Sequence, residues 1–395
     1  MKKIKFLFIA MAAMLTSATF TACSSDDNND VVNNPATYQD QVDQIVKDGK
    51  KHNKVILLVA FGSTWQQAYD SFDATRAEYQ KKFGSNYDVF LSFSSAICIN
   101  RAAAAENTEA RAFYEPKYWL ESFGRVQYQE IVVQSMQVIS GEEFTRVVNA
   151  MKDFANNSNG DLDVNYMAKF AFNNDGTPGE NQLKLGLPLM QTRDDAKILA
   201  GKIDKYFASY ARQGAMLFMG HGNPDEYDTY QANRLYDDLE EELQAINATY
   251  AKNYFVGTVD MKNNFKVQVR DDMQAAGITS GKVFCAPLMT IAGDHAHNDM
   301  ADAEMIPHKF DAQGNDLGPV TNFSELEVND EGEVDDCSWR VYFGIAGSGY
   351  TIDESTFTEA KLVKGLLDYP EIRDIYIDHT TKAEAKDYYH SKLPE

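Results

Sequence analysis

Residues 131–143 read Ile-Val-Val-Gln-Ser-Met-Gln-Val-Ile-Ser-Gly-Glu-Glu, and residues 283–295 read Val-Phe-Cys-Ala-Pro-Leu-Met-Thr-Ile-Ala-Gly-Asp-His. The two stretches align without a gap, and each is an apolar strand followed by a glycine and the acidic start of a helix. Residues 57–63 and 217–223 match in the same way, as a strand that ends in a glycine turn. The matched glycines are similarly spaced, because 141 − 62 is 79 and 293 − 222 is 71. The sequence therefore predicts a duplicated α/β unit, although strand–turn–helix units also resemble one another for physical reasons alone.

Apolar runs alternate with helical segments from Lys54 onward, which is typical of parallel sheets covered by helices on both faces. The roughly 340 residues beyond the N-terminal region exceed what one core usually serves, so we expect an N-terminal lobe at 51–190 and a C-terminal lobe at 191–395. The expected strands are 55–61, 89–93, 130–139, 184–190, 215–219, 254–259, 283–291 and 340–345. The expected helices are 65–82, 141–154, 194–212, 224–247 and 265–276.

One segment breaks this alternation. Residues 303–336 are polar and rich in turn-forming residues, which predicts an insertion between a helix and a strand. We expect it to form a surface hairpin in the C-terminal lobe.

The N-terminal region has the features of a bacterial export signal. Three lysines precede an apolar run at 6–15, which predicts a signal peptide over 1–22. The small residues before Cys23 are typical of a lipoprotein processing site, at which this thiol becomes acylated. Residues 23–50 then form an acidic tether, similar to the export signal of bacterial surface lipoproteins. The prediction is an exported lipoprotein of the outer membrane, with an ordinary signal peptide as the alternative.

Charge and cysteine content exclude several classes of partner. The formal net charge is -22 at pH 7, so nucleic acid and anionic lipid headgroups are repelled. No further stretch is long and apolar enough to span a bilayer, which leaves the lipid anchor as the expected membrane contact. The three cysteines beyond Cys23 show no CxxC spacing, so a disulfide framework is not expected. Assembly into a homo-oligomer is left open.

Two of the seven histidines occupy positions suited to chemistry. His221 directly follows the run 216–220, and His295 follows the run 283–291. Asp260 ends a third run, and ligands bind at this carboxyl edge in open α/β sheets. Two imidazoles and one carboxylate suit Co, Ni, Fe or Zn in the divalent state. For His221 taken alone, a hydrogen-bonded structural histidine is the alternative.

Four stretches carry a resemblance to a known family: Val-Ala-Phe-Gly-Ser-Thr at 59–64, Gln-Ser-Met-Gln-Val-Ile-Ser-Gly-Glu-Glu-Phe at 134–144, Phe-Met-Gly-His-Gly at 218–222, and Pro-Leu-Met-Thr-Ile-Ala-Gly-Asp-His-Ala-His-Asn-Asp-Met at 287–300. Together they resemble the anaerobic sirohydrochlorin cobaltochelatases, which are class II tetrapyrrole chelatases. The resemblance implies two Rossmann-like lobes with the tetrapyrrole in the cleft between them.

The same resemblance implies roles for particular residues. It makes His221 and His295 the metal-binding and catalytic histidines. Asp260 falls where the family has a glutamate ligand, so its reach is one methylene shorter. Contacts with the ring are expected from six residues near the equivalent strand ends, namely Phe61, Ser63, Ser95, Gln134, Met136 and Met289.

The implied activity is insertion of a divalent metal, with cobalt as the first candidate, into sirohydrochlorin or a related ring. Export conflicts with a cytoplasmic biosynthetic task, so a non-catalytic surface lipoprotein that binds a haem, corrinoid or metal is the alternative. A metal-dependent hydrolase, which would need an activated water on the same ligands, is a third class.

Overall fold

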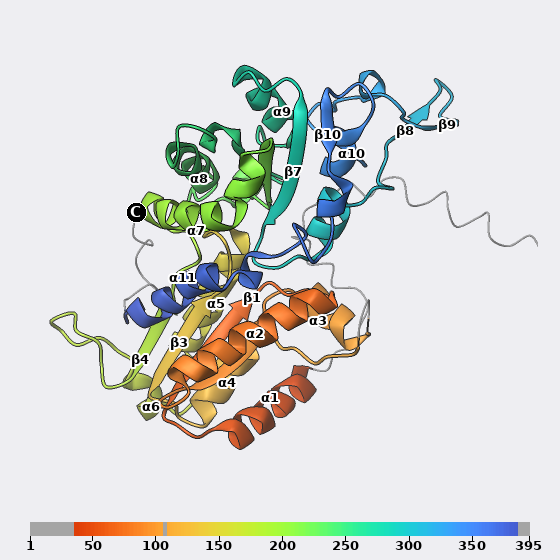
Figure 1. Cartoon of the computed structure of the whole chain (residues 1–395). Coiled ribbons are helices and arrows are strands. Elements are labelled where there is room, and N and C mark those ends of the chain that lie inside the picture. The colour runs from red at the N-terminus through yellow and green to blue at the C-terminus, as the bar shows by residue number, and fades with distance from the viewer. Residues whose placement is uncertain (1–34, 106–108, 386–395) are drawn as a thin grey trace, which may run out of the picture. The chain divides into compact units, whose positions relative to one another are not determined.

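The computed structural model describes residues 35–105 and 109–385, and within them two parallel four-stranded sheets form the framework (Figure 1). The first sheet has the strand order β2-β1-β3-β4, and the second has the order β10-β7-β5-β6. The strands of these sheets are β1 (Lys54–Ala60), β2 (Asp88–Phe93), β3 (Glu130–Ser135), β4 (Gln182–Gly186), β5 (Ala215–Gly220), β6 (Tyr254–Thr258), β7 (Gly281–Leu288) and β10 (Tyr350–Ile352). The helices are α1 (Pro35–Gly49), α2 (Gln66–Phe83), α3 (Ala96–Ala103), α4 (Pro116–Arg125), α5 (Glu142–Ala155), α6 (Val164–Ala168), α7 (Arg193–Ala211), α8 (Arg234–Ala245), α9 (Lys266–Ala275), α10 (Trp339–Gly344) and α11 (Pro370–Lys382).

The predicted duplication is confirmed down to strand register. Val59 of β1 pairs with Ser135 of β3, and Met219 of β5 pairs with Pro287 of β7. These are the pairs that the ungapped alignment of the two repeats matches to one another. Each sheet also places its first strand between the second and third, so the two α/β lobes share one topology.

The two lobes share a buried core. One continuous apolar cluster contains Ile56 and Val132 from the first sheet together with Met216 and Phe284 from the second. Helix α11 contributes to this cluster and packs against β3 and β4, so this helix returns to the N-terminal lobe (Figure 1). The predicted boundary at 190/191 separates the two sheets, and α11, which follows it in the sequence, packs against α7 as well as against the first sheet.

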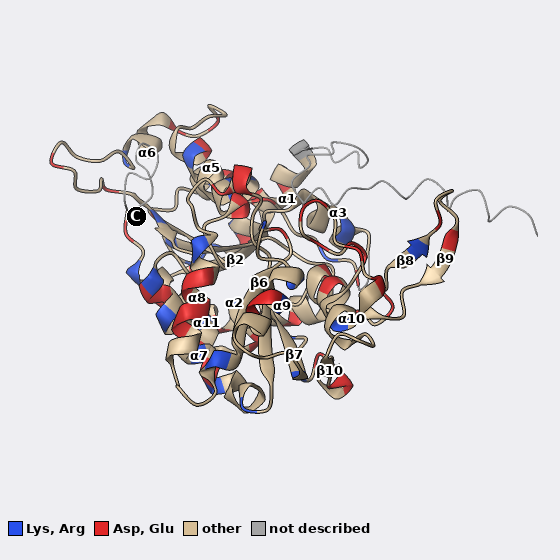
Figure 2. Ribbon diagram, turned by 90° about the horizontal axis from the view of Figure 1, so that it is seen from above, with Lys and Arg blue, Asp and Glu red and all other residues tan. Residues whose placement is uncertain are grey.

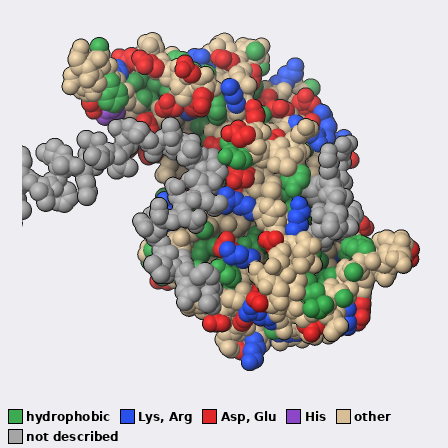
Figure 3. Space-filling view, turned by 180° about the vertical axis from the view of Figure 1, so that it is seen from behind, with side chains coloured by type: hydrophobic (Ala, Val, Ile, Leu, Met, Phe, Trp, Pro, Cys, Tyr) green, Lys and Arg blue, Asp and Glu red, His purple; other side chains and the backbone are tan. Residues whose placement is uncertain are grey.

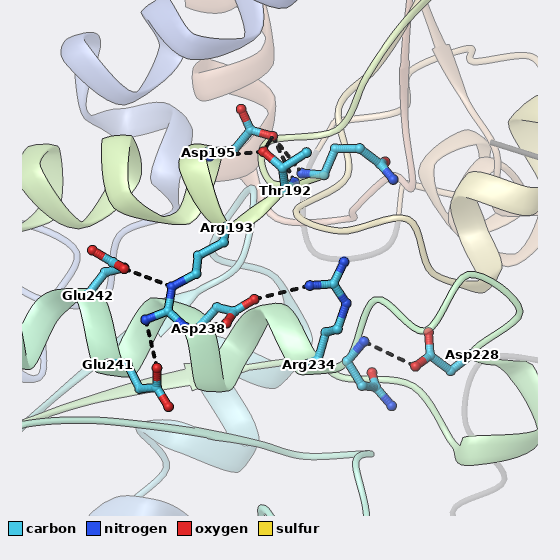
Figure 4. Close-up of polar contacts among 10 residues, drawn as sticks. Thr192, Arg193, Asp195, Asp228, Arg234, Asp238, Glu241 and Glu242 are labelled. Atoms are coloured by element: carbon cyan, nitrogen blue, oxygen red, sulfur yellow. Dashed lines mark hydrogen bonds and ion pairs between the residues drawn. The ribbon is translucent and has the colours of Figure 1, made fainter. Parts of the chain in front are cut away.

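Polar contacts join the start of α7 to α8 (Figure 4). Thr192 caps α7, because its hydroxyl accepts from the Asp195 N–H while the Asp195 carboxylate accepts from the Thr192 N–H. Arg193 then pairs with three acidic side chains of α8, which are Asp238, Glu241 and Glu242.

The expectation of a strand at 340–345 is wrong. This segment lies in α10, where Ser338 caps the helix by accepting from the Val341 N–H. Trp339, Tyr342 and Phe343 are buried at helical spacing, whereas a strand would bury alternate residues. The outer strand of the second sheet is instead the three-residue β10.

The structure also corrects the tether expected at 23–50. From Pro35 to Gly49 the chain is helical, and α1 packs on α4 through the buried Val42 and Val46. Gln39 donates to the Ser122 hydroxyl, and Asp43 pairs with Arg125. Buried residues four positions apart hold this helix to the body, so its role is not that of a flexible spacer.

The predicted insertion contains the predicted hairpin. Strands β8 (His308–Phe310) and β9 (Asp316–Pro319) pair antiparallel within 303–336. The hairpin extends away from the two sheets (Figure 1). Its side chains Phe310 and Leu317 are exposed.

Acidic side chains are spread over the molecule, notably along α8 (Figure 2), and the face opposite to that of Figure 1 mixes them with lysine and arginine (Figure 3). Across the described ranges, no helix combines the length and the apolar character that a bilayer crossing needs. No disulfide joins Cys98, Cys285 and Cys337, the cysteines of that part of the chain. The signal peptide, the lipid anchor at Cys23 and the acidic residues before Pro35 lie outside the described residues and remain predictions.

Candidate metal and tetrapyrrole site

His221 is fixed at the end of the central strand of the second sheet. It follows β5 directly, and its carbonyl accepts from the Asp260 N–H at 2.9 Å, which continues the pairing of β5 with β6. Gly222 has a φ of +78°, and a Cβ there would lie 2.7 Å from that of Met261. Only glycine fits this turn, which brings the chain away from the sheet immediately beyond the histidine.

The His221 ring has a defined hydrogen bond. Its Nδ1 lies 2.8 Å from the Gly222 carbonyl oxygen, and a carbonyl only accepts, so Nδ1 carries the proton. Nε2 is then the nitrogen that can ligate a metal or accept a proton.

Asp260 lies beside His221, as the sequence predicts. One carboxylate oxygen, Oδ2, is 3.5 Å from His221 Nδ1, and it is buried without a hydrogen-bond partner among the described residues. A buried carboxylate oxygen without a donor is suited to a cation. Because Asp260 faces the Nδ1 edge, it shares a metal with His221 Nε2 only after the imidazole turns about its Cβ–Cγ bond.

His295 stands at the start of the turn that follows β7. It precedes a single π-helical turn, Ala296–Met300, a form that is frequent at functional sites. Its Nδ1 lies 2.6 Å from Asp299 Oδ2, so the carboxylate orients the ring and increases the basicity of Nε2. Asp299 is therefore placed as an acceptor that orients His295.

The two imidazoles meet at one place. Their ring centroids are 4.9 Å apart and the planes cross at 85°, and both side chains are about 29% exposed. Metal–nitrogen bonds of about 2.0–2.1 Å allow one ion to bind two rings at such a separation.

The donors do not form a complete metal cage. Over residues 35–105 and 109–385, no group of three or more His, Cys, Asp or Glu side chains is arranged to hold a metal ion. His221 and His295 face one another while Asp260 lies to the side, so the three-ligand set remains a prediction.

The residues flanking His295 contact the N-terminal lobe. The His297 ring stacks on Trp65 with centroids 3.8 Å apart, and its Nε2 is buried without a hydrogen-bond partner among the described residues. Asp294 accepts from Trp65 Nε1 at one carboxylate oxygen, and its other oxygen lies 3.7 Å from Arg101. Burial lowers the pKa of His297. Sequence inspection missed Trp65 because no local pattern links it to a partner 229 residues away.

The six predicted ring contacts have different surroundings. Gln134 is fully buried and bonds to Ser135, Leu187 and Thr380, which gives it a structural role between the sheet and α11. Met136 is buried in the shared core. Ser95 caps α3 and Ser63 accepts from the Trp65 N–H, and both are buried. Phe61 and Met289 are partly exposed, and their contact with a ring remains a prediction.

Comparison with known proteins gives the family of the chain. Residues 54–385 match the model of the cobalt chelatase (CbiK) family, which is most of the chain. The chain belongs to the cobalt chelatase family. It is 23% identical over 266 residues to the sirohydrochlorin cobaltochelatase of Salmonella typhimurium, covering 66% of this chain and 86% of that protein. It is 27% identical over 273 residues to the sirohydrochlorin cobaltochelatase CbiKC of Nitratidesulfovibrio vulgaris, covering 68% and 83%.

Membership of this family makes the protein an enzyme of the chelatase class and confirms the resemblance seen in the sequence. The family match begins at β1, so α1 lies before it. The match continues through the hairpin to the end of α11.

A further contact joins the lobes next to the histidines of this chelatase. Asn223, two residues after His221, accepts at its Oδ1 from the Glu142 N–H at the start of α5. A Cβ on Gly141 would lie 2.3 Å from that oxygen, so glycine permits the approach. The first repeat thus presents a helix N-terminus to the turn that carries His221.

Proposed function

We propose that this protein inserts a divalent metal, with cobalt as the first candidate, into sirohydrochlorin or a closely related tetrapyrrole. The observation that carries the proposal is the meeting of the His221 and His295 rings at 4.9 Å. Family membership supports the reaction class, and the names of the relatives support sirohydrochlorin and cobalt.

Insertion exchanges two pyrrole N–H protons for one M²⁺ ion. The flat ring hides its nitrogen lone pairs from an approaching metal, so the protein must present both the metal and a base at the ring face. His221 and His295 offer Nε2 for ligation, because their Nδ1 atoms are engaged by the Gly222 carbonyl and by Asp299. Once the metal moves to the pyrrole nitrogens, the two released imidazoles can each accept one of the two displaced protons.

Asp260 supplies negative charge beside this pair. Its side chain is one methylene shorter than the glutamate expected at this position in the family. We propose that it becomes a ligand when the His221 ring turns, which brings the buried oxygen and Nε2 to the same ion.

The proposal predicts the outcome of a spectroscopic assay. Purified protein lacking the signal region, mixed with sirohydrochlorin and Co²⁺, should change the visible spectrum of the ring faster than a protein-free control. His221→Ala and His295→Ala should each reduce this rate to near the control, since each removes a donor. His308→Ala is the matched control, because this exposed histidine lies on the hairpin and pairs only with Asp316 there.

The same assay distinguishes metal insertion from the alternative function, which is binding without turnover. The predicted export signal favours a lipoprotein that binds a tetrapyrrole without turnover. Tight binding of the ring with no acceleration of metal insertion would establish that binding function and refute the enzymatic one.

A further inference from the structure

One aromatic side chain of the N-terminal lobe contacts both sides of His295. Trp65 immediately precedes α2. Its indole stacks on the His297 ring, with centroids 3.8 Å apart and planes 9° from parallel. Its Nε1 donates to Asp294 Oδ1 at 2.5 Å. Asp294 and His297 lie one residue before and two residues after His295, so Trp65 spans this segment.

Trp65 is itself held by its own lobe. Its N–H donates to the Ser63 hydroxyl, and its carbonyl accepts from the Tyr69 N–H. Arg101 of α3 approaches the other oxygen of Asp294 at 3.7 Å. The segment is thus held from the opposite lobe by two side chains on two elements.

The two histidines differ in how far they are from their sheet. His221 is the next residue after β5, and backbone bonds to β6 fix it. His295 comes seven residues after β7 ends, beyond the reach of the β-ladder. The first part of this connection is held by the Met136 carbonyl, which accepts from Thr290. Its last part is held by Trp65.

We propose that Trp65 is a positioning residue for metal delivery, which holds the His295 segment from the opposite lobe and so sets the separation between His295 and His221. The expected effect of Trp65 on the rate of metal insertion rests on the proposed function. Its expected effect on metal affinity follows from the position of His295 alone. Displacement of a catalytic group by about 1 Å can reduce a rate by roughly 100-fold, so a side chain that fixes this distance has a measurable effect.

Two substitutions separate the contacts. Trp65→Phe keeps an aromatic face for His297 and removes the Nε1 donor, whereas Trp65→Ala removes both. Affinity for Co²⁺ is measured by titration without a ring, and steady-state rates are then measured with cobalt and sirohydrochlorin varied separately. We expect Trp65→Ala to weaken cobalt binding and lower kcat by roughly 10-fold or more. The cobalt affinity and kcat of Trp65→Phe should lie between those of Trp65→Ala and those of the wild type. In both variants KM for the ring should change less than about twofold.

The control variant is Trp119→Phe, which alters a buried indole of α4 in a cluster remote from the histidines. It should lower the melting temperature and leave cobalt affinity unchanged. A Trp65→Ala protein with wild-type cobalt affinity and a lower melting temperature would show that Trp65 is merely structural. A rise in KM for the ring alone would make Trp65 a wall of the ring site, and would also overturn the proposal.

The experiment distinguishes failure of the proposed function from failure of the inference about Trp65. If the wild type binds Co²⁺ through His295 but never inserts it, the chelatase proposal fails. The role of Trp65 is still decided by the cobalt titration in that case.

Discussion

The His221 and His295 rings lie next to one another, but different contacts hold the two residues in place. The β-ladder fixes His221, whereas His295 depends on Asp299 within its own turn and on Trp65 across the lobes. A histidine oriented by a charged acceptor is a stronger donor through its other nitrogen. If His295 ligates the metal as we propose, the Asp299 carboxylate would act on that metal through His295 without touching it.

Replacing Asp299 by Asn tests this indirect role. Asparagine has nearly the same shape and keeps a carbonyl oxygen, but it has no charge. We expect Asp299→Asn to reduce cobalt affinity and kcat/KM for cobalt by roughly 10- to 100-fold. The measurements are a cobalt titration and initial rates, and unchanged values would show that the 2.6 Å contact is not used.

Sequence reasoning located the histidines better than it located their partners. A polar residue at the end of an apolar run is visible in the chain, which is why His221, Asp260 and His295 could be selected. The orientation of a ring is set by rotation about side-chain bonds and by distant neighbours, so the position of Asp260 at the Nδ1 edge could not be foreseen. Gln134 was misjudged for the same reason, because its burial depends on α11.

At the scale of elements, α8 carries a buried acid with an altered ionisation. Burial raises the pKa of Glu240 to about 7, and the neighbouring Asp272 and Asp237 add to the shift. Its carboxylate accepts from the Val256 N–H at 2.6 Å. The ordinary value is 4.5, so between pH 4.5 and 7 the folded protein holds a proton that the unfolded chain releases. Stability contributed by this group therefore falls as pH rises through that window.

Glu240→Gln should remove this pH dependence. Glutamine stays neutral and can still accept from the backbone, so the variant should be more stable than the wild type above pH 7. The gain is at most about 3 kcal/mol, and it should vanish near pH 4.5. Urea unfolding at pH 5 and pH 8 measures the difference, with Glu241→Gln on the exposed side of α8 as the control. An equal difference at both pH values would contradict the assignment.

Long elements with a clear period were predicted, and short ones were not. The prediction of a strand at 340–345 is wrong because an apolar run of six residues does not distinguish a strand from a buried helix. The signal for a helix is the capping residue Ser338, which lies outside that run. The three residues of β10 carry no signal of their own. Helix α1 was assigned to a tether because the acidic sequence before it outweighed the helical spacing of Val42 and Val46.

The whole molecule has two repeats but one shared core. Residues of both sheets and of α11 belong to a single buried cluster, and α11 lies on the lobe opposite to its place in the sequence. Separating the lobes would expose this cluster to water, so neither lobe should unfold alone.

We therefore expect one cooperative thermal transition. Calorimetry should give equal calorimetric and van't Hoff enthalpies for the protein without its signal region. Far-ultraviolet circular dichroism and tryptophan fluorescence should give coincident curves. Two resolved transitions would show that the lobes are independent.

The duplication was predictable at this scale because its evidence lies in spacing and order. The ungapped match of 131–143 to 283–295 indicated two equivalent units, and matched residues of the two units hold matching positions in their sheets. The contacts between the lobes were not predictable, since they join residues such as Trp65 and Asp294 that share no local pattern.

The most direct test of the account is the position of cobalt in crystals of the protein soaked with Co²⁺, measured by anomalous scattering at the cobalt edge. The account predicts a peak about 2.1 Å from Nε2 of both His221 and His295. A peak bound to only one of these histidines, or cobalt bound only elsewhere on the protein, would contradict it.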